Sequence, residues 1–214
     1  MPVQHSQYEF TNTWFRDTAQ NFWDKLVPQL KPTKILEIGS YEGASACYLI
    51  DKVASTVELE LHCVDTWAGG VEHGSGGEYA VDMRAVEERF HRNIGLAQAR
   101  AGKPVALRIH KSRSDVALST LIAQGFGNHF DLIYIDGSHQ APDVLSDAIL
   151  AFRLVRKGGV VAFDDYLWFE GLPTDRDPLR TPKPAVDAFV NIYIRRLNII
   201  YGPSYQFYVQ KICD

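Results

Sequence analysis

The stretch Ile35-Leu-Glu-Ile-Gly-Ser-Tyr-Glu-Gly43 decides the fold. The apolar run Lys34–Ile38 is typical of a short buried strand, and the turn after it opens a helix over residues 44–53. Gly39 lets the backbone approach a ligand closely, and Gly43 lets the helix begin against the strand. A strand, a glycine turn and a helix in this order predict an α/β sheet that binds a ligand at the carboxyl ends of its strands.

Short apolar strands alternate with helices along the rest of the chain. We expect strands at 59–65, 104–110, 130–136 and 160–163, a turn at 157–159, and helices at 81–101, 114–124, 141–156 and 185–196. Two final strands, 198–201 and 205–211, are joined by Gly202-Pro203. This connection is too short for a parallel crossover, so the two strands must form an antiparallel hairpin. The pattern predicts a Rossmann-like α/β fold: a mostly parallel mixed sheet with helices on both faces.

Length and composition favour one folded domain. The chain has 214 residues, of which 46% are hydrophobic and 22% charged, so it can bury a core and is not dominated by disorder. We expect a single domain over residues 1–214, with a helical extension over 1–33 that carries an amphipathic helix over 11–30. Two stretches rich in glycine or proline, 67–80 and 166–184, are expected to be loops at the active site.

Charge and cysteine content exclude several partners. The net charge of −4 provides no general basic field for nucleic acid or an anionic membrane. No secretory leader and no apolar run long enough to span a membrane is visible. The three cysteines are scattered and odd in number, which argues against a disulfide scaffold. The expected setting is cytoplasmic.

An acid at the end of the second strand suggests a nucleoside ligand. Asp65 follows Gly39 by 26 positions, close to the offset of roughly 20 residues at which a carboxylate meets a ribose diol. The spacing Gly39-x-x-x-Gly43 differs from the Gly-x-Gly-x-x-Gly of pyrophosphate binders, which argues against a nicotinamide dehydrogenase. The alternative for Asp65 is a helix or turn cap.

Four segments in order carry a family resemblance: 35–43, Val64-Asp-Thr-Trp67, Tyr134-Ile-Asp-Gly-Ser-His139 and Lys157-Gly-Gly-Val-Val-Ala-Phe-Asp-Asp-Tyr166. Together they resemble the class I S-adenosylmethionine-dependent methyltransferases, over a range from about Lys34 to Lys211. More narrowly, they resemble the small-molecule O-methyltransferase branch that includes sugar and antibiotic-tailoring enzymes. The resemblance implies a seven-stranded sheet with one antiparallel strand inserted late.

The resemblance also implies S-adenosylmethionine as the cofactor. Glu37 would face its methionine end, Asp65 would hold the ribose hydroxyls, and Trp67 would flank the adenine. The full set of implied cofactor-binding residues is Glu37, Gly39, Ser40, Gly43, Asp65, Trp67, Ser114 and Asp136. Ser114 would lie near the adenine amine, although Ser112 stands where the family often has glycine. The alternative for Ser114 is the N-cap of the helix that follows.

Three carboxylates are expected at the rim formed by strands four and five: Asp136, Asp164 and Asp165. Crowded like charges raise one another's pKa, and a divalent cation relieves this repulsion. Oxygen ligands suit Mg²⁺, and in the metal-dependent branch, whose site is of the catechol O-methyltransferase kind, the matching positions bind it. In metal-independent relatives these acids only cap a turn or pair with an arginine.

The expected reaction is transfer of a methyl group to a hydroxyl of a small acceptor such as a sugar or natural product. The candidate catalytic residues are Asp136 and His139, which lies three positions later at the start of a helix. Two alternatives stay open: a metal-independent methyltransferase with His139 or Asp136 as the base, and a non-catalytic nucleotide-binding module. His73, Arg176, Arg180 and Lys183 are candidates for closing the site or binding the acceptor, and a homo-oligomer is left open.

Overall fold

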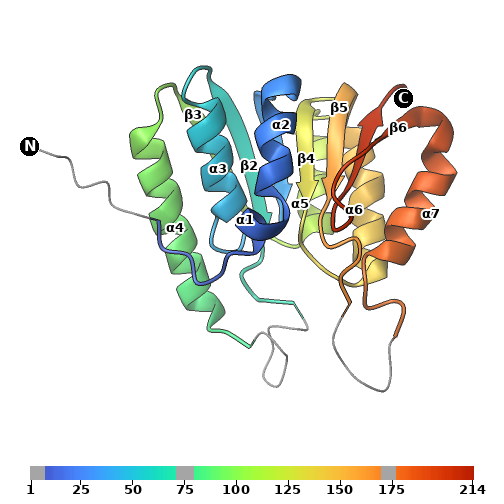
Figure 1. Cartoon of the computed structure of the whole chain (residues 1–214), viewed down its shortest axis with the longest axis horizontal. Helices are drawn as coiled ribbons and strands as arrows, with labels where there is room; N and C mark the ends of the chain where they lie inside the picture. Colours follow the sequence, from blue (N-terminus) through green and yellow to red (C-terminus); the bar gives the residue numbers. More distant parts are fainter. Residues whose placement is uncertain (1–7, 71–79, 170–176) are drawn as a thin grey trace, which may run out of the picture.

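The computed structural model describes residues 8–70, 80–169 and 177–214. Within these residues, a seven-stranded sheet forms the centre of the protein in the order β3-β2-β1-β4-β5-β7-β6 (Figure 1). Its strands are β1 (Lys34–Ile38), β2 (Leu59–Asp65), β3 (Val105–Lys111), β4 (Phe130–Ile135), β5 (Val155–Phe163), β6 (Leu197–Ile200) and β7 (Phe207–Lys211). The predicted Rossmann-like fold is confirmed.

The strand directions explain where a ligand can bind. Strands β3, β2, β1, β4 and β5 pair in parallel, whereas β7 runs antiparallel to both β5 and β6. The predicted hairpin of the last two strands is therefore confirmed. The chain crosses from the β1–β2–β3 half to the β4–β5 half between β1 and β4. In open α/β sheets, ligands bind at the carboxyl ends of the strands at such a reversal of strand order.

Helices cover both faces of the sheet. The buried cluster on one face joins Trp23, Leu49 and Phe90, from α2 (Gln20–Leu30), α3 (Ala44–Val53) and α4 (Met83–Arg100), to the strands. The cluster on the other face joins Leu118 and Phe189 and contains residues of α5 (Ser114–Ala123), α6 (Ala141–Leu154) and α7 (Lys183–Tyr193). Figure 1 shows the sheet between these two layers. Strands buried on both sides explain why their sequences are almost continuously apolar.

Two predicted elements differ from the structure. The turn expected at 157–159 is wrong, because these residues continue β5, which pairs with β4 through a register shift between Phe130 and Leu132. Two consecutive glycines are typical of a turn, but here Gly158, at φ +81°, and its neighbour let the strand form an irregular bulge. The single helix expected over 11–30 is divided into α1 (Trp14–Thr18) and α2, which meet at Ala19. Among the described residues, no helix is both long and apolar enough to cross a membrane.

Candidate active site

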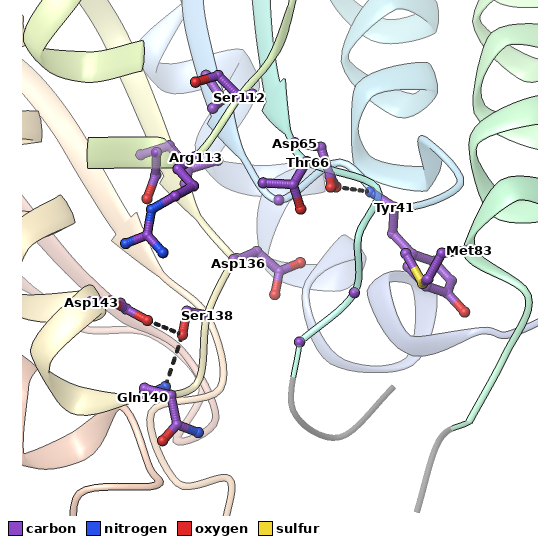
Figure 2. Close-up of a pocket in the computed structure, with 17 residues that line it drawn as sticks. Tyr41, Asp65, Thr66, Met83, Ser112, Arg113, Asp136, Ser138, Gln140 and Asp143 are labelled. Atoms are coloured by element: carbon purple, nitrogen blue, oxygen red, sulfur yellow. Dashed lines mark hydrogen bonds between the residues drawn. The ribbon is translucent and has the colours of Figure 1, made fainter. Parts of the chain in front are cut away.

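A cavity of about 360 Å³ opens at the carboxyl ends of β1, β2 and β4. Figure 2 shows Tyr41 and Met83 on one side of it, Ser138, Gln140 and Asp143 on the other, and Asp136 between them. The lining residues are Ile38, Gly39, Tyr41, Val64, Asp65, Thr66, Gly69, Gly70, Met83, Ser112, Arg113, Ser114, Asp136, Gly137, Ser138, Gln140 and Asp143. Four of the predicted cofactor-binding residues, Gly39, Asp65, Ser114 and Asp136, therefore share one cavity.

The turn after β1 is packed directly against the end of β4. Gly39 has φ +85°, and a Cβ at this position would lie 1.9 Å from the backbone oxygen of Asp136 and 2.7 Å from the Cα of Gly137. The Gly39 N–H donates to the carbonyl of Val64 in β2 at 2.8 Å. Only glycine combines this backbone conformation with such close contact, so the sequence places glycine where three strand ends meet.

Asp65 holds the same turn through its carboxylate. One oxygen accepts the backbone N–H groups of Ser40 and Tyr41, each at 2.9 Å, and the other accepts the N–H of Trp67 at 2.7 Å. The predicted alternative, a turn cap, is thus what the structure shows. The carboxylate also lines the cavity. Since an ionised carboxylate offers about four acceptor positions, three such bonds leave room for a ligand hydroxyl.

Glu37 lies behind the cavity wall, fully buried. Its carboxylate accepts the hydroxyl of Ser40 at 2.6 Å and that of Ser45 at 2.5 Å. Burial raises the pKa of Glu37 to about 7, and the two serine hydroxyls oppose this shift. Glu37, Ser40 and Gly43 are absent from the cavity lining, so in this structure they shape the turn, and their cofactor contacts stay predictions.

Trp67 is also absent from the cavity lining. Its indole N–H donates to the carbonyl of Tyr41 at 3.0 Å, and its ring packs on Phe90 with the centroids 4.8 Å apart. Trp67 therefore supports Tyr41, which does line the cavity. Tyr41 was not among the predicted site residues, although it lies inside the glycine turn. Met83 was not predicted either, and the sequence offers no signal for it.

Ser114 is the first residue of α5 and lines the cavity. The N-cap residue of this helix is Arg113, which makes no side-chain cap bond, so the alternative that Ser114 is the N-cap is wrong. Asp143 and Ser138 line the cavity as well, and the Asp143 carboxylate accepts the hydroxyl of Ser138 at 2.8 Å (Figure 2). Asp143 was not among the predicted site residues, because it is one of two acids on a helix of ordinary composition.

The three carboxylates predicted at the rim do converge. Asp136 lines the main cavity, and Asp136, Asp164 and Asp165 also line a second cavity of about 10 Å³. Burial and the neighbouring carboxylates hold the pKa of Asp136 well above its usual range, and the same two causes raise the pKa of Asp164 to about 6. The described residues contain no group of three or more His, Cys, Asp and Glu side chains already arranged to hold a metal ion.

Asp164 is held by a buried chain of hydrogen bonds. It accepts the hydroxyl of Tyr134 and, at 3.1 Å, the amide of Gln206 from just before β7. Tyr208 donates to Gln206 and accepts the indole N–H of Trp23 at 3.0 Å. The orientation of Asp164 therefore depends on residues from α2, β4 and β7.

His139 forms a pair with Asp165. Its Nε2 lies 2.9 Å from a carboxylate oxygen of Asp165, and its ring stacks on Trp168 with centroids 4.1 Å apart. These contacts fix the ring beside the carboxylate rim. Lys183 is paired with Asp187 at 2.6 Å on α7, and neither Lys183 nor Arg180 lines the main cavity. His73 and Arg176 lie outside the described residues.

Comparison with known proteins identifies the family. Residues 36–166 match the family described as "Methyltransferase domain". This range runs from the middle of β1 to just past β5 and includes every residue that lines the main cavity. The chain belongs to this family. It is an S-adenosylmethionine-dependent methyltransferase with the class I fold, as its motifs predict.

Two curated relatives are similar to this chain over most of its length. A probable caffeoyl-CoA O-methyltransferase 3 of Dictyostelium discoideum is 28% identical over 197 residues, which cover 88% of this chain and 67% of the relative. An uncharacterized protein of Acanthamoeba polyphaga mimivirus is 26% identical over 61% of this chain, which spans 50% of that relative's length. This methyltransferase thus spans between half and two thirds of these curated relatives.

Solved structures share the fold. An O-methyltransferase from Bacillus cereus in complex with SAH has a TM-score of 0.60 and 17% identity, over 97% of this chain and 84% of that one. The O-methyltransferase TomG from Streptomyces achromogenes, in complex with SAM, has a TM-score of 0.59 and 18% identity, over 94% of this chain and 87% of that one.

Proposed function

We propose that this methyltransferase binds S-adenosylmethionine in the 360 Å³ cavity and transfers its methyl group to a hydroxyl of a small acceptor such as a sugar or natural product. One observation carries the proposal: Gly39, Asp65, Ser114 and Asp136, which come from separate strand ends, all open onto this cavity. Small-molecule sites are typically concave, with a few convergent polar groups.

Each wall of the cavity suits one part of the cofactor. Asp65 offers its remaining acceptor position to the ribose hydroxyls while it holds the turn. Ser114, the first residue of α5, lines the cavity and would meet the adenine amine. Gly39 would let the chain pass close to the methionine end, and Asp136 lines both this cavity and the smaller one that it shares with Asp164 and Asp165.

The acceptor is expected to bind at the rim formed by Asp136, His139 and Asp165. Methyl transfer from a sulfonium is an in-line displacement, so the enzyme has to aim the acceptor oxygen and remove its proton. Trp168 and Asp165 fix the His139 ring from two sides, and this restricts where an acceptor hydroxyl can lie.

Three observations bear on a divalent cation. Asp136, Asp164 and Asp165 supply the carboxylate oxygens that Mg²⁺ prefers. The neighbouring carboxylates contribute to the raised pKa of Asp136 and Asp164, and a cation would offset this repulsion between negative charges. Hydrogen bonds from Tyr134 and Gln206 to Asp164 are the kind of support that ligating carboxylates receive. The donor set therefore fits a cation in its chemistry, although the side chains are not yet arranged around one.

We infer that these three acids would hold Mg²⁺. The cation would lower the pKa of a bound acceptor hydroxyl, as it does for bound water. Asp136 and His139, which line the smaller cavity with Asp164 and Asp165, would then take up the released proton.

A metal-independent reaction is the second candidate. The pair of His139 and Asp165, 2.9 Å apart, favours it, because a carboxylate that orients an imidazole raises its capacity to accept a proton. In that case His139 alone would deprotonate the acceptor.

The test starts with binding. Calorimetry should show that the protein binds S-adenosylhomocysteine and does not bind NAD, and absence of S-adenosylhomocysteine binding would contradict the proposal.

A panel of polyols, sugars and phenols is then assayed with labelled S-adenosylmethionine, with and without EDTA and added Mg²⁺. The cation proposal expects activity lost in EDTA and restored by Mg²⁺, and it expects Asp165→Ala to abolish turnover while cofactor affinity persists. Activity indifferent to EDTA but lost in His139→Ala would favour the second candidate. Asp51→Asn, an exposed change on α3, is the control.

A further inference from the structure

The two oxygens of the buried Asp164 carboxylate have different partners. Its Oδ2 accepts two hydrogen bonds, one from the hydroxyl of Tyr134 and one from the side-chain amide of Gln206 at 3.1 Å. Its Oδ1 accepts one, from the backbone N–H of Asp165 at 2.8 Å. An ionised carboxylate offers about four acceptor positions, two on each oxygen. Counting the partners within residues 8–70, 80–169 and 177–214, Oδ2 is fully occupied and Oδ1 keeps one position.

The direction of these hydrogen bonds is set at the far end of the chain, by Trp23. An indole N–H can only donate, and here it donates to the hydroxyl oxygen of Tyr208 at 3.0 Å. The Tyr208 hydroxyl in turn donates to the amide oxygen of Gln206. The NH₂ group of Gln206 therefore has to face Asp164. A flipped amide would set its oxygen against the carboxylate, so the chemistry of the chain decides the orientation of this glutamine.

The core under α2 holds both donors to Oδ2 in place. Trp23, Tyr134 and Tyr208 are fully buried. The ring of Trp23 packs on that of Tyr134 with centroids 4.8 Å apart, and Phe22 packs on Tyr208 with centroids 4.6 Å apart. Side chains in such a core do not move aside without loss of packing. Asp164 can therefore give a cation a single oxygen, Oδ1, while Oδ2 stays bonded to protein.

We propose that Gln206 and Tyr134 are positioning residues that restrict Asp164 to one ligating oxygen and thereby favour Mg²⁺ over Ca²⁺. Calcium takes about six to eight oxygens and often uses both oxygens of a carboxylate, whereas the smaller Mg²⁺ requires near-octahedral geometry. A carboxylate with one oxygen available suits Mg²⁺ and denies Ca²⁺ a ligand. This inference rests on the proposed function, since it takes Asp136, Asp164 and Asp165 to hold the cation.

The experiment compares two cations on variants that release Oδ2. Dissociation constants for MgCl₂ and CaCl₂ are measured by calorimetry on the full chain after removal of metal with EDTA. We expect the wild type to bind Mg²⁺ more tightly than Ca²⁺. Gln206→Leu and Tyr134→Phe should each weaken Mg²⁺ binding by about tenfold or more, as loss of a partner of a ligating group typically does. Binding of Ca²⁺ should stay nearly unchanged, because the released oxygen becomes a second ligand atom, so the ratio of the two constants falls by about tenfold.

Matched variants separate this role from a structural one. Gln210→Leu makes the same substitution on β7, but the Gln210 amide donates to the carbonyl of Gly158 at 3.0 Å, so the ratio should not change. Tyr208→Phe leaves Gln206 free to flip, and the ratio should fall as in Gln206→Leu. Asp164→Asn should abolish binding of both cations, which shows that the measured site is the rim.

The ratio decides the inference, because a purely structural role would weaken both cations equally. An unchanged ratio in folded Gln206→Leu and Tyr134→Phe proteins overturns it, as does a wild type that binds Ca²⁺ more tightly than Mg²⁺. If Gln206→Leu does not fold, Tyr134→Phe, which removes a single oxygen atom, decides. Failure of the wild type to bind Mg²⁺ at all would instead overturn the cation site of the proposed function.

Discussion

The contact of Gly39 with the end of β4 gives a prediction that can be worked out in detail. In Gly39→Ala, the new Cβ would lie 1.9 Å from the Asp136 backbone oxygen, whereas real Cβ contacts are essentially never below 3.0 Å. The strand ends would have to separate by about 1 Å, since the clashing atoms belong to the backbone. Gly125→Ala is the matched control, because Gly125 has φ +90° but nothing within 4 Å of its added Cβ.

The two substitutions share one cost and differ in the other. A left-handed conformation costs a non-glycine residue about 1–2 kcal/mol, and this applies to both variants. Overpacking adds about 1–3 kcal/mol in Gly39→Ala alone. For a domain of this size each kcal/mol lowers the melting temperature by about 2–4 °C, so Gly39→Ala should melt about 2–12 °C below Gly125→Ala.

Thermal denaturation and calorimetry check both consequences. Because Asp136 and Gly137 line the cavity, Gly39→Ala should also bind S-adenosylhomocysteine more weakly, while Gly125→Ala binds it like the wild type. Equal melting temperatures for the two variants, or full affinity in Gly39→Ala, would refute the close contact as the reason for glycine here.

Three other predictions concern the carboxylates of Asp65, Glu37 and Asp131. Asp65→Ala removes the acceptor of three backbone N–H groups. Loss of even one charge-assisted bond of about 1.5–3 kcal/mol should weaken S-adenosylhomocysteine binding tenfold or more, measured by calorimetry, and should also lower the melting temperature. Unchanged affinity and melting temperature would exclude a role of Asp65 in the turn. Glu37→Gln should gain stability relative to the wild type from pH 5 to pH 8. Burial raises the pKa of Glu37 to about 7, so the wild-type folded state increasingly bears the cost of ionising this acid as the pH rises. Denaturant unfolding at both pH values would show no such trend if Glu37 titrated normally. Burial tends to raise the pKa of Asp131, but Arg156 and the N–H groups of Thr33 and Lys34 outweigh burial and hold this pKa below its usual range. The stability that Asp131 contributes is therefore present above about pH 4 and lost on acidification. The free energy of unfolding of the wild type should exceed that of Asp131→Asn by less at pH 3 than at pH 7, and a constant difference would contradict the assignment.

The fold was predictable because its signals are local or periodic. Apolar strands such as Lys34–Ile38 and 130–135 are buried on both faces, which leaves a continuous hydrophobic pattern. The shortness of the Gly202-Pro203 connection excluded a parallel crossover. Glycines 158 and 159 misled the prediction, because a bulge inside a strand and a turn between strands require the same conformational freedom.

The site was predictable only where topology brings strand ends together. Gly39, Asp65 and Asp136 follow strands that pair, so their meeting is a consequence of strand order. Side-chain direction is not encoded in that order. Trp67 lies at the expected place yet turns its ring onto Phe90, and Glu37 faces two serines. Tyr41 and Met83 enter the cavity through packing that depends on residues distant in the chain.

The hydrogen-bond chain from Trp23 to Asp164 bears on how the enzyme is made in the cell. Gln206 and Tyr208 complete this chain, and β7 inserts between β5 and β6, both of which are translated earlier. A nascent polypeptide that has emerged from the ribosome only as far as β5 therefore has Asp164 without its amide partner and a sheet with an open edge. Docking of β7 closes that edge and, in the same step, orients Asp164 at the carboxylate rim. An incomplete translation product should therefore be unable to consume the methyl donor.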